Sequence, residues 1–253
     1  MDNKLTVGFL LCAINSFCQI SPPGISDANV AFWSALGLSQ ELSEKWSLSV
    51  YAGNSRQSDP DNMALFKNQA IFVINEETTF EFNNYFSLSA CASYRVQNRY
   101  QSEEPFSPAD PAMKNEERYY LRFYFREQIG KTKFKFSFRP ELRKFSSAGH
   151  RPWSPVDEEV RLRLKGQASI PLGNPSKQLI ISNEILAVTG RVKIGEAEQW
   201  SGYTITEDRL ATFYRHVFPH VVADFGVMHQ IMHDGQYRAH VAFDLVLMNP
   251  FNH

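Results

Sequence analysis

The sequence predicts an all-β protein, an antiparallel transmembrane β-barrel of 10–12 strands with a polar lumen rich in Arg and Glu. Three observations lead to this prediction. Residues 118–143 alternate between an apolar and a cationic face over two segments. Alternating segments recur along the chain and run about 11–17 residues, whereas soluble strands usually have about 5–6. Short turns also alternate with longer loops, which is typical of bacterial outer-membrane barrels.

The clearest alternation is a hairpin that turns at Ile129, Gly130 and Lys131. Successive side chains on a strand point to opposite faces, so each strand has one apolar and one largely cationic face. The apolar phase holds Tyr119, Leu121, Phe123, Phe125, Thr132, Phe134, Phe136, Phe138 and Leu142. In a membrane barrel this phase meets lipid and the cationic phase lines the lumen.

Composition narrows the class of protein. The 253 residues carry 26 basic and 27 acidic side chains, a net charge of -1 that gives no reason to expect a nucleic-acid partner. Aromatic residues make up 13% of the chain. No run approaches the roughly 18 apolar residues of a transmembrane helix, which excludes a helical membrane protein. A membrane β-barrel is not excluded, because its sequence signal is spread over many short alternating segments.

The N-terminus predicts export. Lys4 precedes an apolar stretch at residues 7–14, and Ser16 and Cys18 place small residues where a signal peptidase reads them. We therefore expect a signal peptide at residues 1–18, an N-terminal segment at 19–44 and the barrel at 45–253. Of the three cysteines only Cys91 would remain in the mature chain, so no internal disulfide is expected. We expect Cys91 to be an ordinary lumen-facing residue.

The segment at residues 27–42 contains Trp33 and is either a first strand or a plug inside the barrel. Ten strands are then expected at residues 45–53, 66–82, 85–101, 118–128, 132–143, 158–170, 178–188, 203–217, 220–233 and 237–248. Each is supported by two-residue alternation, for example Trp46, Leu48 and Val50 on one phase. If the short turns face the periplasm, these ten strands end on that side.

Turn chemistry separates the strands. Short turns lie near residues 43, 83, 130, 173 and 218, and Asp234 with Gly235 is a strong hairpin signal. Longer loops are expected at residues 54–62, 101–115, 146–156 and 189–202, where Pro, Gly and polar residues gather. The final segment alternates and ends near Phe251, which resembles the C-terminal signal read by barrel-assembly machinery. Expected partners are therefore outer-membrane lipid and that machinery during biogenesis.

The candidate site is the lumen, because charged side chains share the inward phase. Its members are Arg95, Arg99, Arg118, Arg122, Arg126, Arg139, Glu141, Arg143, Glu159, Arg161 and Arg163. Opposite charges on neighbouring strands stabilise a sheet, and in a narrow lumen they would also keep the barrel shut. Clustered Arg can instead attract and bind small anionic solutes. The sequence leaves both interpretations open.

Catalytic and metal-binding patterns are weak. His229 and His233 share a strand face but lie about 13 Å apart at strand rise, too far to hold one metal together. Glu207 and Asp208 are neighbours and point to opposite faces, so they cannot act as an acid pair. No Ser and His signature of a lipid hydrolase stands out. We expect no cofactor and no metal, and we do not expect an enzyme.

Several motifs resemble DUF2490, a family of Gram-negative outer-membrane barrels common in Bacteroidetes. They include Trp33, Lys45 with Trp46, the hairpin motifs at 126–128 and 139–143, the run 159–163, the strand motif 182–184, and Asp224, Phe225 and Gly226 followed by Gln230. The resemblance implies an outer-membrane barrel and transfers no site residues.

The expected function is that of a narrow porin-like channel, a small-solute binder or a structural barrel in the bacterial outer membrane. One alternative is an outer-membrane lipid-modifying enzyme. The other is a soluble periplasmic barrel of the lipocalin type, with its apolar face inside. That alternative would place many Arg side chains on the outer surface of nearly every strand.

Overall fold

The computed structural model describes residues 28–147, 149, 151–153, 156–194 and 197–251. The signal peptide expected at residues 1–18 lies outside the described residues. Twelve strands are present in the part of the chain that the structure describes. They are β1 (Val30–Glu41), β2 (Trp46–Gln57), β3 (Asn68–Glu81), β4 (Phe86–Tyr100), β5 (Pro108–Ile129), β6 (Thr132–Ser147), β7 (Val156–Leu172), β8 (Asn174–Ile194), β9 (Ala197–Trp200), β10 (Thr204–Val217), β11 (Val221–Met232) and β12 (Tyr237–Met248).

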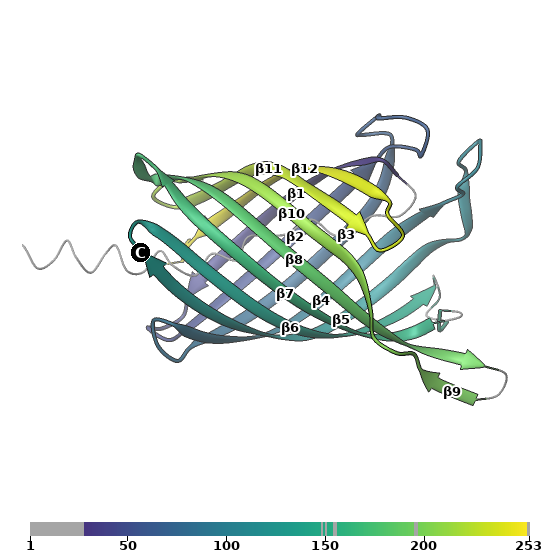
Figure 1. The fold of residues 1–253 in the computed structure, drawn as a ribbon, viewed down its shortest axis with the longest axis horizontal. Coiled ribbons are helices and arrows are strands. Elements are labelled where there is room, and N and C mark those ends of the chain that lie inside the picture. The colour runs from purple at the N-terminus through teal and green to yellow at the C-terminus, as the bar shows by residue number, and fades with distance from the viewer. Residues whose placement is uncertain (1–27, 148, 150, 154–155, 195–196, 252–253) are drawn as a thin grey trace, which may run out of the picture.

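Eleven of these strands form a closed barrel (Figure 1). Each strand from β1 to β8 pairs with the next along the chain, β8 also pairs with β10, and β10, β11 and β12 follow in order. The short β9 pairs with the far end of β8 and projects beyond the barrel rim. The predicted all-β barrel and its strand number are therefore confirmed.

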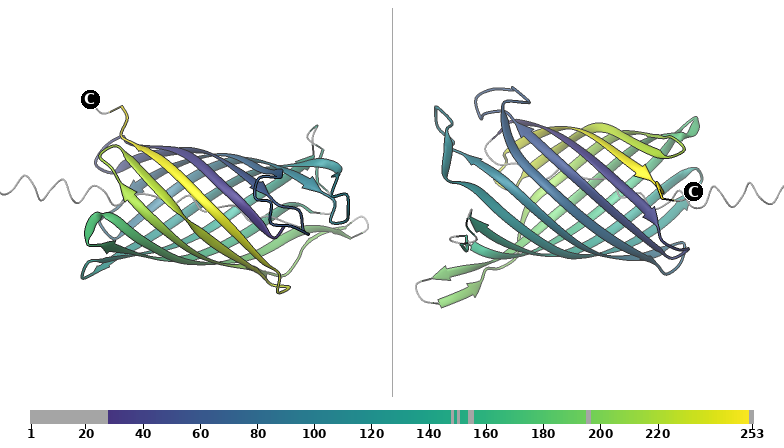
Figure 2. Two further views of the ribbon diagram at one scale, coloured as in Figure 1. Left: turned by 90° about the horizontal axis from the view of Figure 1, so that it is seen from above. Right: turned by 180° about the vertical axis from the view of Figure 1, so that it is seen from behind.

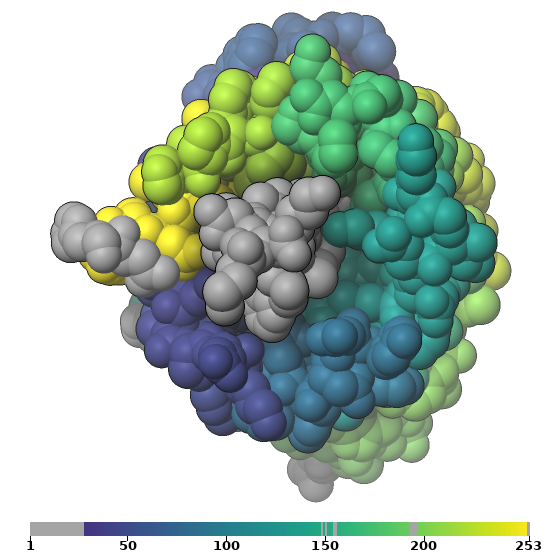
Figure 3. All heavy atoms as spheres, turned by 90° about the vertical axis from the view of Figure 1, so that its left-hand side faces the viewer, coloured from purple at the N-terminus to yellow at the C-terminus, as the bar shows by residue number. Residues whose placement is uncertain are grey.

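The barrel closes through a parallel pair, and here the fully antiparallel prediction is wrong. β1 pairs with β12 from Val30 opposite Ala239 to Ser39 opposite Met248. The reason is the odd number of strands. When all other neighbours in a closed ring are antiparallel and the number of strands is odd, the first and last strands must run in the same direction. Figure 2 shows β1 and β12 side by side along this seam, and the end-on view in Figure 3 shows the purple and yellow parts of the described chain on the same side of the barrel.

The segment expected at residues 27–42 thus contains β1, a strand of the barrel wall, at Val30–Glu41. β1 lies between β12 and β2 and makes ladders with both. Its described start lies at the end of the barrel that carries the longer loops, and β12 finishes at the end that carries the short turns (Figure 1). Ten strands after residue 44 were expected to end at the short turns, and they do. Adding β1 makes the number odd.

All four expected loops are partly strand. β2 extends to Gln57, inside the loop expected at 54–62, and β6 extends to Ser147, inside the one expected at 146–156. β5 begins at Pro108, inside the loop expected at 101–115, and β8 extends to Ile194, inside the one expected at 189–202. Prolines hid the start of β5, because a proline removes a ladder donor and argues against a strand. Here Pro108 is the first residue of its strand, and the register shifts between Asn98 and Tyr100 on the facing strand. Proline is tolerated at both kinds of position.

The two faces of the wall differ as the alternation predicts. Every barrel strand presents at least one large apolar side chain outward with more than a third of its surface exposed, such as Leu36, Phe123, Leu164 and Phe225. Inward side chains are mostly buried, including Cys91, which is in no disulfide. The molecule's packed interior is therefore its lumen, and its apolar surface is outside.

Candidate functional site in the barrel lumen

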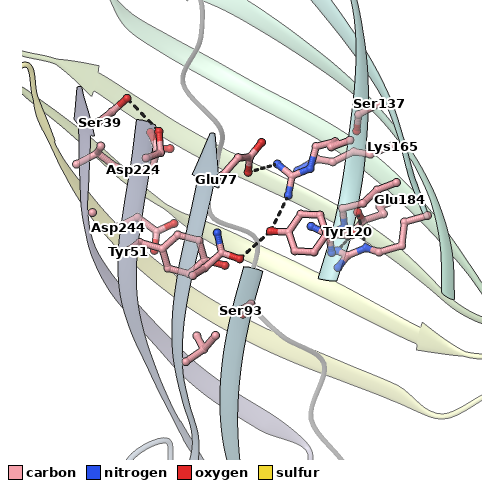
Figure 4. A pocket seen from close by; sticks show the side chains of 18 of the residues that line it. Ser39, Tyr51, Glu77, Ser93, Tyr120, Ser137, Lys165, Glu184, Asp224 and Asp244 are labelled. Atoms are coloured by element: carbon pink, nitrogen blue, oxygen red, sulfur yellow. Dashed lines mark hydrogen bonds and ion pairs between the residues drawn. The ribbon is translucent and has the colours of Figure 1, made fainter. Parts of the chain in front are cut away.

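A cavity of about 100 Å³ lies inside the barrel (Figure 4). Side chains from all eleven barrel strands contribute to its lining. The charged members are Arg95, Arg118, Arg122, Arg139, Arg161, Arg163, Arg209, Arg215, Lys135, Lys165, Glu77, Glu184, Asp224 and Asp244. Ten cationic side chains therefore face four acidic ones around this space.

The eleven lumen residues expected from the sequence fall into three groups according to where they lie in the structure. Six line the cavity: Arg95, Arg118, Arg122, Arg139, Arg161 and Arg163. Four others, Arg126, Glu141, Arg143 and Glu159, form ion pairs on the inward face without lining it. Arg99 lies nearer the rim, where its guanidinium is 4.9 Å from the centre of the Trp153 ring.

Glu116 is the centre of one ion-pair cluster. Its carboxylate accepts hydrogen bonds of 2.5 Å from Nε of both Arg118 and Arg143, and Nη1 of Arg95 lies 3.8 Å away. Arg143 also forms an ion pair with Glu159. Glu116 is only 3% exposed, so solvent screens these interactions little. Three neighbouring strands, β4, β5 and β6, are held together by one carboxylate.

A second cluster continues around the wall from β6 to β10. Arg163 donates from Nε and Nη2 to Glu184, at 3.0 and 2.5 Å, and from Nη1 to Glu141 at 3.3 Å. Glu141 also pairs with Arg139. Arg209 lies 3.9 Å from Glu184 and donates to Glu207. The paired geometry of Arg163 and Glu184 is the fork that fixes a guanidinium on a carboxylate.

Tyrosine hydroxyls organise the third polar group. Tyr124 donates to Glu77 at 2.9 Å, and Nη1 of Arg122 lies 3.1 Å from the same carboxylate. Tyr120 donates to Asn75 Oδ1 at 2.7 Å, as Figure 4 shows. These contacts connect β3 with β5 across the inside of β4.

An acidic corner lies on the wall formed by β10, β11 and β12. Asp224 and Asp244 are directly opposite each other on adjacent strands and are both buried. Arg215 donates to the two oxygens of Asp224 at 2.7 and 2.6 Å. Nε1 of Trp33 donates to Oδ1 of Asp244 at 2.9 Å, whereas Oδ2 of Asp244 is buried without a hydrogen-bond partner.

An apolar cluster fills the lumen beside this corner. Its buried members are Trp33, Ala35, Val73, Ile180, Ala211, Phe213, Met228 and Ala242. The two large rings sit over glycines of neighbouring strands, Trp33 over Gly53 and Phe213 over Gly226. An interior of about eight strands is just filled by side chains, so eleven strands need long ones, and Arg, Trp and Phe provide that length.

A second cavity, of about 350 Å³, lies at the end that carries the longer loops. It is lined by Gln57, Gln97, Asn98, Arg99, Tyr100, Lys114 and Trp153. Nζ of Lys114 lies 3.8 Å from the ring centre of Phe145 and 5.2 Å from that of Trp153. Basic side chains therefore extend from this rim toward Arg95 and Arg118 inside.

Sequence reasoning missed several side chains that complete the lumen. Glu116 fell between the loop expected at 101–115 and the strand expected at 118–128, and Glu77 fell in a strand whose alternation is irregular. Four further residues lie on predicted strands and are buried on the inward face, but they were not among the predicted lumen residues: Arg209, Arg215, Asp224 and Asp244. Asp224 and Glu184, which also lines the cavity, were present among the motifs of the family resemblance, and those motifs were the available signal.

The histidines and the acid pair are divided between the two faces of the barrel wall. His240 is buried in the lumen, where its Nε2 lies 3.1 Å from Oε1 of Gln230. The ring of His229 stacks on that of Tyr237. Glu207 is buried inside and Asp208 is bonded to Asn183 on the other face. Over the described part of the chain, no group of three or more His, Cys, Asp or Glu side chains could hold a metal ion.

Comparison with known families decides the relationship. The family model described as a protein of unknown function, DUF2490, matches residues 30–240. The chain belongs to the DUF2490 family. The resemblance expected from the sequence is therefore confirmed. A comparison with curated proteins gives no match.

The DUF2490 match begins at Val30 in β1 and ends at His240 in β12, so it includes residues of every strand of the closed barrel. Several residues that carried the resemblance lie in the lumen, among them Trp33, Arg139, Glu184 and Asp224. In this member of DUF2490 residues of these motifs thus contribute to the interior of the barrel, whereas Trp46 and Phe225 are exposed on its outer face. No helix among the described residues is long and apolar enough to cross a membrane.

Proposed function

We propose that this protein is an outer-membrane β-barrel, exported through a cleaved signal at residues 1–18, whose lumen binds a small anionic solute. The observation that carries the anion-binding part is the surplus of cationic side chains around the central cavity. The membrane part rests on the outer surface. Each part has its own test.

The outer surface supports a place in a lipid bilayer. Large apolar side chains are exposed on every barrel strand, whereas soluble proteins rarely expose large continuous apolar patches. Aromatic rings also gather near the short turns: Trp46 packs on Phe80 at 4.8 Å between ring centres, and Phe86 on Phe125 at 5.1 Å. Girdles of aromatic residues at the interfaces are typical of membrane barrels.

Strand length supports the same placement. The barrel strands have 12–22 residues, and a tilted strand needs about 9–11 to cross a bilayer. A soluble lipocalin-like barrel would carry its apolar face inside. Here the inward face holds the arginines and the outward face holds Phe, Leu and Ile, which disfavours that alternative.

The packed lumen favours binding over free diffusion. In a water-filled pore the inward side chains would be exposed. Instead Glu141, Asp244, Trp33 and Phe213 are each at most 1% exposed, and ion pairs link neighbouring strands on the inside. We therefore favour a closed barrel with an internal site over a porin-like channel.

The charge balance of the cavity favours an anion. Ten cationic side chains line it against four acidic ones. Three further carboxylates do not line the cavity but pair with arginines that do: Glu116, Glu141 and Glu207. With them the acidic side chains number seven, so the ten cationic side chains exceed them by three. Arg161 forms no hydrogen bond or ion pair within the described residues, and its buried Nε lacks a partner. Clustered guanidinium groups bind carboxylate and phosphate well.

Heat-modifiability tests the membrane part. The outer-membrane fraction is isolated, and gel mobility is compared between unboiled and boiled samples. We expect a compact band that shifts on boiling, and recovery of the protein with the membranes. Release with the soluble periplasm would overturn the membrane assignment.

Calorimetry on the detergent-purified protein tests the anion part, with lactate and inorganic phosphate as probes. We expect binding that weakens by about tenfold or more in Arg161→Gln, the loss of one charge-assisted contact. The matched control is Arg151→Gln, an exposed arginine at the rim. Absence of binding to wild-type protein, or equal effects of both substitutions, would show a purely structural lumen.

A further inference from the structure

The acidic corner contains one carboxylate oxygen with no donor. Asp224 and Asp244 face each other across β11 and β12 and are 4% and 1% exposed. Arg215 engages both oxygens of Asp224. Oδ1 of Asp244 accepts from Trp33, and Oδ2 has no partner. The Asp244 side chain lines the central cavity.

This arrangement lacks a positively charged donor. Like charges directly opposite each other on neighbouring strands are unfavourable, and Arg215 donates to both oxygens of Asp224. A buried acceptor without a donor also destabilises the state that contains it. An ammonium group in the cavity would supply both the missing charge and the missing N–H.

The cationic wall lies on the other side of the same cavity. In the ring of eleven strands β12 is separated from β6 by five steps through β11 and six steps through β1, so the two are opposite. Arg118, Arg139 and Arg161, on β5, β6 and β7, line that wall. Figure 4 shows Asp224 and Asp244 on one side of the cavity and Lys165 and Glu184 on the other.

We infer that the cavity binds a small zwitterion, with its ammonium group on Asp244 and its carboxylate on the arginine wall. An α-amino acid has this chemistry. The inference rests on the proposed anion-binding function and adds the second pole. A plain anion would leave Oδ2 of Asp244 without a donor. A plain amine would leave Arg161 without a counter-charge, whereas Arg118 and Arg139 already pair with Glu116 and Glu141.

Size and surroundings restrict the ligand further. A volume of about 100 Å³ suits a molecule of few heavy atoms. Trp33, Val222 and Val246 line the cavity near the acidic corner, so a short apolar side chain would meet apolar neighbours there. Glycine and alanine are the natural first probes.

The test compares isosteric pairs on the full chain purified in detergent. Glycine is paired with glycolate and alanine with lactate, so that a hydroxyl replaces the ammonium group and the carboxylate is kept. Calorimetry gives the affinity of each. We expect the amino acid of each pair to bind about tenfold or more tightly than its hydroxy acid, as a charge-assisted bond would give.

Asp244→Asn is the decisive variant, because Asn keeps the acceptor for Trp33 and nearly the same volume. We expect this variant to bind the amino acids only as tightly as the hydroxy acids. Its affinity for the hydroxy acids should equal that of the wild type. Asp61→Asn, in an exposed loop, is the control and should change neither. A gel shift on boiling shows that each variant is folded.

The possible failures are distinct. If hydroxy acids bind as tightly as amino acids, or if Asp244→Asn weakens both classes equally, the zwitterion inference is wrong and the anion site stands. If neither class binds to wild-type protein, the proposed anion site and the zwitterion inference fail together.

Discussion

Trp33 lies over Gly53 so closely that a Cβ on the glycine would be 2.1 Å from the nearest carbon of the indole ring. The two residues belong to adjacent strands, β1 and β2, and Trp33 is 1% exposed. The glycine therefore makes room for the largest side chain of the lumen cluster. Gly53 is needed because it has no side chain, so adding a side chain at this position should lower the stability of the barrel.

Gly53→Ala should destabilise the barrel by about 1–3 kcal/mol, as overpacking of a filled interior usually does. The measurement is the urea midpoint of unfolding in detergent, followed by tryptophan fluorescence. Gly166→Ala is the matched control, because a Cβ there would meet Phe136 at an ordinary 3.5 Å. Equal midpoints for the two variants would contradict the proposed fit.

Glu116→Gln should destabilise the barrel strongly, by about 3–5 kcal/mol, because it removes a buried carboxylate and leaves arginine charges uncompensated. Arg118 and Arg143 both donate to this carboxylate at 2.5 Å. The readout is the temperature at which the compact gel band is lost. Its neighbour Glu117 is exposed on the other face, so Glu117→Gln should shift that temperature little. A similar shift for both would show that the cluster is dispensable.

Removing the rings of the lumen cluster should open a conducting path. Wild-type protein in planar bilayers should conduct weakly, since Trp33 and Phe213 are each 1% exposed inside the wall. The double variant Trp33→Ala with Phe213→Ala should give larger steps that favour anions, because the remaining lining is cationic. Phe225→Ala, on the outer face, is the control. Large conductance in the wild type would refute a closed lumen.

The loop between β2 and β3 should loosen in acid. Burial raises the pKa of the Asp59 carboxyl, but hydrogen bonds from Lys67, Asn68 and Asn62 outweigh that effect and hold the pKa below its ordinary value of 3.8. A lowered pKa in the folded state means that the carboxylate stabilises the loop above pH 3.8. This contribution is lost as the pH falls through the lowered value.

Limited proteolysis of residues 58–67 measures this effect. Wild type should resist cleavage better than Asp59→Asn at about pH 6, and the difference should vanish once the pH lies below the lowered pKa of Asp59. Asp61→Asn serves as the control, since its carboxylate is exposed. A difference that persists at low pH would mean that the charge of Asp59 does not hold the loop.

The sequence could predict the faces of the wall because alternation is local. Phe123 and Arg122 are neighbours, and their opposite directions follow from strand geometry alone. Strand ends were harder where proline hid them, as at Pro108. The parallel seam was out of reach, because the pairing of Val30 with Ala239 is encoded by residues more than two hundred positions apart.

The candidate site was predictable to the same extent. Arg118, Arg139 and Arg161 were placed inward because alternation gives the face. The partners were not, since a contact such as Arg215 with Asp224 depends on which strands adjoin and in which register. The acidic corner needs three strands in register at once, and that information is absent from any single segment.

The parallel seam also has a consequence for the order of events during folding. Joining β1 to β12 closes a loop of nearly the whole chain, a step that must wait until the last strand has been made and whose entropic penalty grows with the length enclosed. Ladders between consecutive strands can form earlier, because each needs only a hairpin. Parallel pairs are slightly less stable per residue than antiparallel ones. The seam should therefore be the last junction to form and the first to exchange its amide hydrogens.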